Sequence, residues 1–128
     1  MIVLDTHAWI FLADDPTRLG KAARRAIAKA DRLGVAAVSL WELTLLVERR
    51  RLSLDRDLLP WIQGALGDPR FELLPLTPAV VATAHQLRGA LDGDPGDRLI
   101  VATAMIEGAK LVSKDSRITE SGVVPVLW

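Results

Sequence analysis

Short apolar runs alternate along the chain with longer stretches in which apolar residues recur every three or four positions. The short runs are rich in Val, Ile and Leu and end at polar residues, Gly or Pro, which is typical of buried strands. They cover residues 2–5, 35–38, 71–74, 110–114 and 124–127. The longer stretches predict helices at residues 7–13, 19–31, 40–51, 55–66, 78–91 and 97–107. This alternation predicts an α/β fold, in which a parallel sheet carries helices on both faces.

Polar residues suited to capping stand at three of the predicted helix starts. Ser39 is predicted to cap the helix from residue 40, because residues 39–42 have the spacing of a capping box. Asp55 is predicted to cap the next helix. Asp94 is followed by a proline and then by Asp97, an order that indicates Asp94 as a cap and Asp97 as a first-turn acid.

Four acidic residues lie where the apolar runs meet strand ends or helix starts: Asp5, Glu42, Asp97 and Asp115. In a parallel α/β sheet these positions meet at one edge, where ligands bind, so the four carboxylates are expected to converge. Only Asp115 directly follows a basic residue. Helix capping explains each acid singly but not their shared position, which favours a site for one or two Mg2+ ions and hence phosphodiester chemistry.

The composition narrows the possible classes of function. The 128 residues suffice for one domain with its own core, and the absence of Cys excludes disulfides and cysteine-based zinc sites. No stretch approaches the ~20 apolar residues of a membrane span, and the first residues make a poor signal peptide, so a cytoplasmic protein is expected. The net charge is zero, but residues 18–51 hold nine Lys or Arg and three acids. Such polarity can steer a polyanion toward one side of the molecule.

The acids lie in blocks that occur in a fixed order over the whole chain. The blocks are V-L-D-T-H at residues 3–7, V-S-L-W-E-L at 38–43, D-P-G-D-R-L-I-V-A-T-A at 94–104, L-V-S-K-D at 111–115 and V-L-W at 126–128. This ordered set resembles the PIN domain, in particular the VapC toxin ribonucleases of toxin–antitoxin pairs. The resemblance implies a three-layer α/β/α sandwich around a central, mostly parallel five-stranded sheet, formed by a single PIN domain over residues 1–128.

The same resemblance implies RNA cleavage that depends on Mg2+ or Mn2+. It marks Asp5 and Asp97 as the firmest metal ligands. Glu42 and Asp115 would complete the acidic pocket, directly or through water. The expected partners are an RNA substrate, a VapB-like antitoxin and a second copy of the chain in a homodimer.

Residues beside the acids have competing explanations. The hydroxyls of Thr6 and Ser113 can orient a carboxylate or a water near a metal, or can cap a backbone amide. Asp94 is assigned as a helix cap only. Gly96 stands where the family often has a bulky aromatic residue, so the loop before Asp97 is expected to be either more mobile or shaped for another partner.

The cationic and aromatic residues are also open to two interpretations. His7 either contacts RNA or is a first-turn helix residue without a chemical role. Lys114 and Arg117 either meet the RNA backbone or form solvated surface. Arg98 is expected in a structural ion pair, with contact to a phosphate or to the antitoxin as the alternatives. Among the tryptophans, the pair predicted to line a groove for a second subunit or an antitoxin is Trp9 and Trp61.

Two other classes of protein share parts of this pattern. A phospho-receiver domain has a similar length and an acidic pocket, but it needs an Asp after the third strand and a Lys on the last one. Here the third strand ends in Leu74-Pro75 and the last carries no Lys, which excludes this class. A PIN nuclease that is not a toxin, or a PIN-like scaffold used only for binding, remains an alternative, although the retention of all four acids weighs against a scaffold.

Overall fold

The computed structural model describes residues 1–128, which form five strands and seven α-helices. The strands are β1 (Ile2–Leu4), β2 (Leu33–Ala36), β3 (Phe71–Leu74), β4 (Lys110–Val112) and β5 (Val126–Leu127). They form one sheet in the order β3-β2-β1-β4-β5, and every neighbouring pair is parallel. The predicted α/β fold and its five-stranded sheet are therefore confirmed, and the sheet is parallel throughout.

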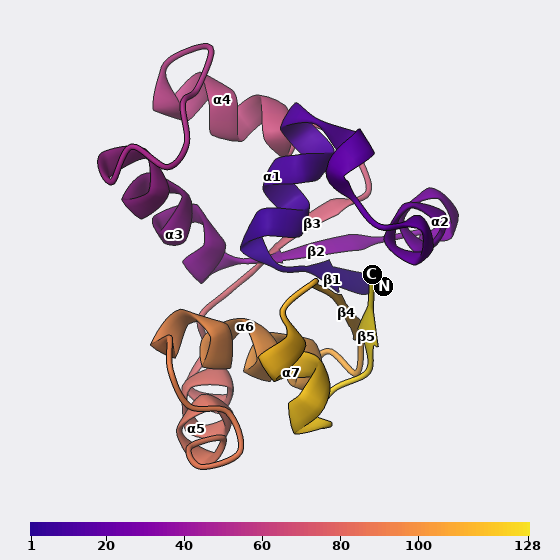
Figure 1. The fold of residues 1–128 in the computed structure, drawn as a ribbon, viewed down its shortest axis with the longest axis vertical. Coiled ribbons are helices and arrows are strands. Elements are labelled where there is room, and N and C mark those ends of the chain that lie inside the picture. The colour runs from indigo at the N-terminus through magenta and orange to yellow at the C-terminus, as the bar shows by residue number, and fades with distance from the viewer.

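The helices form a layer on each face of this sheet (Figure 1). One layer holds α1 (Thr6–Asp14), α2 (Lys21–Lys29), α3 (Ala37–Glu48) and α4 (Leu58–Ala65), with a short 3-10 turn at Pro16–Arg18. The other layer holds α5 (Pro78–Gln86), α6 (Pro95–Ile106) and α7 (Ser116–Ser121). The three-layer sandwich is thus the observed architecture, and both chain ends lie together at one side of the sheet (Figure 1).

Each face of the sheet has its own hydrophobic core, because successive strand residues point in opposite directions. Leu4 and Val112 pack under α1 to α4, whereas Val3 and Leu111 pack under α5 to α7. All four side chains are fully buried. The central strands are therefore held from both sides, which makes their carboxyl ends rigid anchors for whatever side chains follow them.

The winding of the chain creates a crevice at those carboxyl ends. From β1 the chain moves outward through β2 and β3, then returns to the other side of β1 to form β4 and β5. The reversal falls between β1 and β4, whose last residues Leu4 and Val112 are direct neighbours. In open α/β sheets this is the place where ligands bind.

The second strand and third helix begin two to three residues earlier than predicted. Gly34 lies within β2 and does not end the preceding helix. A Cβ atom at Gly34 would lie 2.7 Å from a methyl carbon of Leu74, so the glycine allows close packing rather than a turn. As a result Ser39 is buried inside α3, whose cap is Ala36 without a side-chain bond. The predicted capping box is wrong, and Glu42 lies in the second turn of α3.

Two further helix predictions need correction. Asp55 does not cap α4, because the helix begins after Asp57. The Asp55 carboxylate instead pairs with Arg56 at 3.0 Å. Helix α7 was not predicted, because its six residues are polar apart from one buried side chain, Ile118, and so show no apolar period. Where few apolar residues mark an element, local pattern carries little information about it.

The tryptophans are placed differently from the prediction. Trp9 and Trp61 meet edge to face, with ring centroids 5.7 Å apart, and are 0% and 7% exposed. Both belong to the core, although Trp61 also lines a surface hollow. The exposed indole is that of Trp41 on α3, at 61%. None of the helices has the length and apolar character needed to cross a membrane.

Candidate functional site

The four predicted carboxylates lie at the carboxyl edge of the sheet or on helices that reach it. Asp5 directly follows β1 and caps α1, accepting a 2.8 Å hydrogen bond from the Ala8 amide. Asp115 follows β4 and caps α7. Asp97 lies in the first turn of α6, and Glu42 faces it from α3. That these four acids bind metal and act in catalysis stays a prediction from the sequence.

The tightest carboxylate group includes a residue that the sequence analysis assigned only to capping. Glu42, Asp94 and Asp97 each offer an oxygen within 4.8 Å of the other two. Asp94 does cap α6, since its Oδ1 accepts from the Gly96 amide at 2.9 Å. The spacing of Asp94 and Asp97 could have shown that Asp94 joins this group, because residues three apart at a helix start lie on one side of the helix.

Gly96 makes room for this group. It is the second residue of α6, so the predicted placement of Gly96 in a loop is wrong. A Cβ atom at Gly96 would overlap the Glu42 carboxylate and lie 3.2 Å from Asp94 Oδ1. The bare backbone therefore allows Glu42 to reach the start of α6.

Buried hydroxyls hold Glu42 from the other side. Thr6 Oγ1 lies 2.5 Å from Glu42 Oε1 and donates to it, and shares a second hydrogen bond with Ser39 Oγ at 3.0 Å. Both hydroxyl residues are buried. The predicted role of Thr6 in orienting a carboxylate agrees with this geometry. Ser113 Oγ accepts from the Asp115 amide at 3.1 Å, and its side-chain hydrogen bond to Asp5 offsets part of the rise in the pKa of that carboxyl, so both roles predicted for Ser113 fit this geometry.

Arg117 supplies a cation that the sequence analysis did not place in the site. Its Nη2 lies 3.2 Å from Asp97 Oδ2 and 3.1 Å from Asp115 Oδ2. The arginine is more than half exposed, so water screens both pairs. Arg117 bridges Asp97 and Asp115, while Glu42 and Asp94 have no basic partner.

The acids differ in pKa, because some are more deeply buried and Asp115 is better paired with Arg117. Burial raises the pKa of Asp97 from 3.8 to about 7, and the neighbouring charges of Asp94 and Glu42 add to the rise. Burial also raises the pKa of Asp5 and of Glu42. The hydrogen bond from Arg117 instead lowers the pKa of Asp115. The inner part of the cluster therefore carries more negative charge than its surroundings stabilise.

These side chains fit a divalent cation. The donors are carboxylate oxygens from α3 and from the start of α6, which suit a hard ion such as Mg2+. The raised pKa of Asp97 shows that the folded protein alone stabilises its anionic form poorly. A cation bound between Glu42, Asp94 and Asp97 would remove that repulsion.

Arg98 and His7 are two further residues that the sequence places beside the acids. Arg98 forms no ion pair, and its Nε is buried without a hydrogen-bond partner, so the predicted structural pair is wrong. His7 is exposed and lies edge to face with Phe11 at 6.1 Å. The charged groups of Arg18 and Lys114 lie 4.1 and 5.2 Å from the centre of the same ring. These cations form a basic rim beside the acids.

A groove extends from the acids along α3. We call this groove, which has a volume of about 400 Å3, the carboxylate groove. Its acidic end holds Asp5, Glu42 and Asp97, and its opposite end holds Arg49 and Arg51. The walls between are formed by side chains of α3 and by the first two turns of α6.

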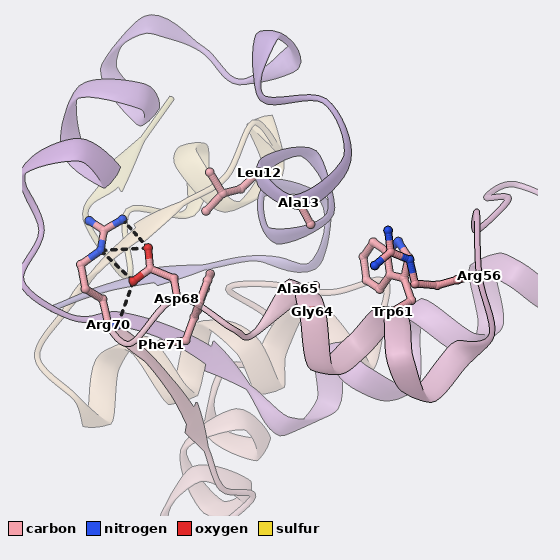
Figure 2. Close-up of a pocket in the computed structure, with 9 residues that line it drawn as sticks. All are labelled: Leu12, Ala13, Arg56, Trp61, Gly64, Ala65, Asp68, Arg70 and Phe71. Carbon is pink, nitrogen blue, oxygen red and sulfur yellow. Dashed lines mark hydrogen bonds and ion pairs between the residues drawn. The ribbon is translucent and has the colours of Figure 1, made fainter.

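A second hollow of about 360 Å3 lies between α1, α4 and the start of β3, away from the acids (Figure 2). We call it the Arg70 hollow. Figure 2 shows Arg70 and Asp68 facing each other at its edge, and their ion pair measures 2.9 Å. Arg70 also donates to the carbonyls of Ile27 and Ala30 at the end of α2. These charged groups are satisfied by structural contacts, so the hollow offers no free reactive group.

Comparison with known proteins agrees with this geometry. The sequence model of the PIN domain matches residues 2–122. Ribonuclease VapC22 of Mycobacterium tuberculosis is 43% identical over 117 residues, which cover 91% of this chain and 88% of the relative.

Solved structures share the fold at lower identity. DNA-bound VapBC from Salmonella typhimurium superimposes with a TM-score of 0.72 at 20% identity, covering 98% of this chain and 97% of the other. VapC20 of Mycobacterium tuberculosis, a sarcin-ricin loop cleaving toxin, gives a TM-score of 0.70 at 18% identity with both chains fully covered. From the match over nearly its whole length and the 43% identity to VapC22, the chain belongs to the PIN-domain family of VapC ribonucleases.

Proposed function

We propose that this chain is a metal-dependent endoribonuclease that acts as the toxin of a toxin–antitoxin pair. The observation that carries the proposal is the under-compensated acid cluster at the crevice between β1 and β4, in a chain 43% identical to Ribonuclease VapC22. The proposed site residues are Asp5, Glu42, Asp97 and Asp115, with Asp94 added from the geometry. The whole chain would act as a single domain in the cytoplasm.

The proposed cofactor is Mg2+, with Mn2+ as a substitute. When bound, such an ion supplies a nucleophilic water at neutral pH and stabilises charge on the reacting phosphate. The chain's own residues hold the ligands in place. Asp5 is fixed by the Ala8 amide, and Glu42 is aimed by the Thr6 hydroxyl. Because Asp97 has a pKa of about 7, cation binding near neutral pH is expected to release a proton.

The charge around the acids favours an anionic substrate once a cation is present. Arg18, Lys114 and Arg117 line a hollow together with Asp5 and Asp97. These cations can attract an RNA backbone while the acids are neutralised by metal. Structures that share this fold include VapBC complexes, so we propose a VapB-like antitoxin as a protein partner. The homodimer that the PIN-domain resemblance implies is proposed beside it.

RNA cleavage with and without metal tests the proposal. Purified protein is expected to cleave RNA in Mg2+ and to lose this activity in EDTA. Asp97→Asn should lower the cleavage rate by more than about a hundredfold, since loss of a group supporting a metal ligand already costs about 10- to 100-fold. Asp14→Asn, at the exposed end of α1, is the matched control and should keep full activity.

Undiminished cleavage by folded Asp97→Asn would contradict the assignment of the site. A wild-type protein that binds Mg2+ but cleaves no RNA would instead point to the binding-scaffold alternative. Circular dichroism and thermal unfolding of each variant separate loss of the site from loss of the fold.

A further inference from the structure

The carboxylate groove contains an exposed aromatic residue that the proposed chemistry does not use. Trp41 is 61% exposed, far more than the other three tryptophans, which belong to or pack against the core under α1 to α4. It lines the groove next to Glu42, and its indole nitrogen makes no hydrogen bond within the chain. An exposed indole beside a reactive centre offers a flat face on which a ligand ring can stack.

The far end of the same groove is cationic. Arg49 and Arg51 both line it, are exposed and form no ion pair. Between them Arg50 adopts a positive φ of 57°, and Arg50 does not line the groove. The turn after α3 therefore directs two of three consecutive arginines to this surface.

Helix α3 aligns these features. Trp41, Leu45 and Arg49 are four residues apart and so share one side of the helix. Arg49 lies seven residues beyond Glu42, a distance of roughly 10 Å along the axis. A few nucleotides of extended single strand span such a distance. Figure 1 shows α3 and the start of α6 at the same edge of the molecule.

We propose that the carboxylate groove is a subsite for unpaired RNA, in which one base stacks on Trp41 and a neighbouring phosphate is bound by Arg49 and Arg51. This inference rests on the proposed ribonuclease function, since it places the reacting phosphate at the carboxylate end. Unpaired bases are read mainly by stacking on aromatic side chains, and arginines bind the backbone.

The charges of the groove favour RNA over a peptide. An acidic peptide would be attracted by Arg49 and Arg51 but repelled by the acids at the other end. A basic peptide would meet the opposite problem. RNA carries phosphates along its length, so the arginines can bind one while a cation between Glu42 and Asp97 bridges another.

Binding of RNA in Ca2+ tests the subsite without relying on cleavage, because a cation that takes carboxylate ligands then neutralises the acids at the other end of the groove. The probe is a fluorescein-labelled pool of random single-stranded RNA, about 10 nucleotides long, within the usual site sizes for such strands. Fluorescence anisotropy with wild-type protein should show salt-sensitive binding. Trp41→Ala should weaken it about tenfold, in the range measured for loss of one base–aromatic stack, while Trp41→Phe should retain most of the affinity.

The arginines supply the matched comparison. Arg49→Gln and Arg51→Gln should each weaken binding and lower the salt dependence by about one phosphate contact. Arg50→Gln removes the same charge from the intervening position and should have much the smaller effect. The three variants differ in position but not in chemistry, so a general loss of positive charge would affect them equally.

The outcomes separate this proposal from the proposed function. No RNA binding by wild-type protein, equal affinity of Trp41→Ala, or equal effects of all three arginine variants would overturn the subsite, even if the protein cleaves RNA. The expected pattern in a protein that does not cleave would support the subsite and contradict the nuclease. If Trp41→Ala leaves RNA affinity unchanged but disrupts a co-expressed protein complex, the groove serves a protein partner instead.

Discussion

The carboxylate groove and the Arg70 hollow have similar volumes, about 400 and 360 Å3, but their acids differ in state. In the Arg70 hollow the hydrogen bonds from Arg70 hold the pKa of Asp68 below its usual range. In the groove burial and neighbouring acids raise the pKa of Asp97 to about 7. A concave surface alone therefore does not mark the site; the under-compensated charge does, because a bound cation would relieve it.

The largest expected difference between the two regions is in how their acids make the stability of the metal-free protein depend on pH. Asp97 has a higher pKa in the folded than in the unfolded chain, so the folded chain binds more protons between pH 4 and 7. Stability from this residue should therefore fall as pH rises through that window, by a few kcal/mol in total at about 1.4 kcal/mol per pKa unit. Asp97→Asn should remove this loss. Urea unfolding in EDTA at pH 5 and pH 8 measures it.

Asp68→Asn is the control from the other region. The pKa of Asp68 is lowered by folding, so its contribution is present above its unfolded pKa and is lost only in acid. Its removal should change stability equally at pH 5 and pH 8. If Asp97→Asn behaves in that same way, the acids of the two regions do not differ as described.

A smaller effect is expected from filling the space at Gly96. Gly96→Ala should displace the Glu42 carboxylate, because the new Cβ would overlap it. We expect about tenfold weaker Mg2+ or Mn2+ binding by calorimetry, comparable to the loss of a group that orients a ligand. Gly64→Ala, at the edge of the Arg70 hollow, meets no atom closer than 3.7 Å and should leave metal binding unchanged. Equal metal affinity of Gly96→Ala and wild type would show that Glu42 can bind from elsewhere.

The smallest effect is expected at Arg117, the only cation paired within the acid cluster. Arg117→Gln removes a positive charge next to Asp97, so Mg2+ should bind about two- to fivefold more tightly, the scale of an exposed ion pair. Calorimetry at two salt concentrations checks this, because screening should reduce the difference. Weaker binding in Arg117→Gln would mean that the arginine positions the acids more than it competes with the metal.

Strong apolar patterns and residue order predicted most of the fold. The strand at Phe71–Leu74 and the start of α6 after Asp94 agree closely with the structure. The errors in the bounds of the elements arise where a glycine can either end a helix or allow close packing within a strand. Gly34 lies inside β2, where it allows a close approach within the sheet, and β2 and α3 therefore begin before the predicted residues 35 and 40.

The sequence by itself determined the layered α/β architecture, the family, and the presence of acids at strand ends and helix starts. These follow from periodicity and order, which are local properties of a chain. Only the tertiary structure decided which charges are shared. It brought Asp94 to Glu42, placed Arg117 between Asp97 and Asp115, and exposed Trp41 while burying the other candidates. The physical reason is that burial and electrostatic interaction depend on distances across the fold, which spacing along the chain does not specify.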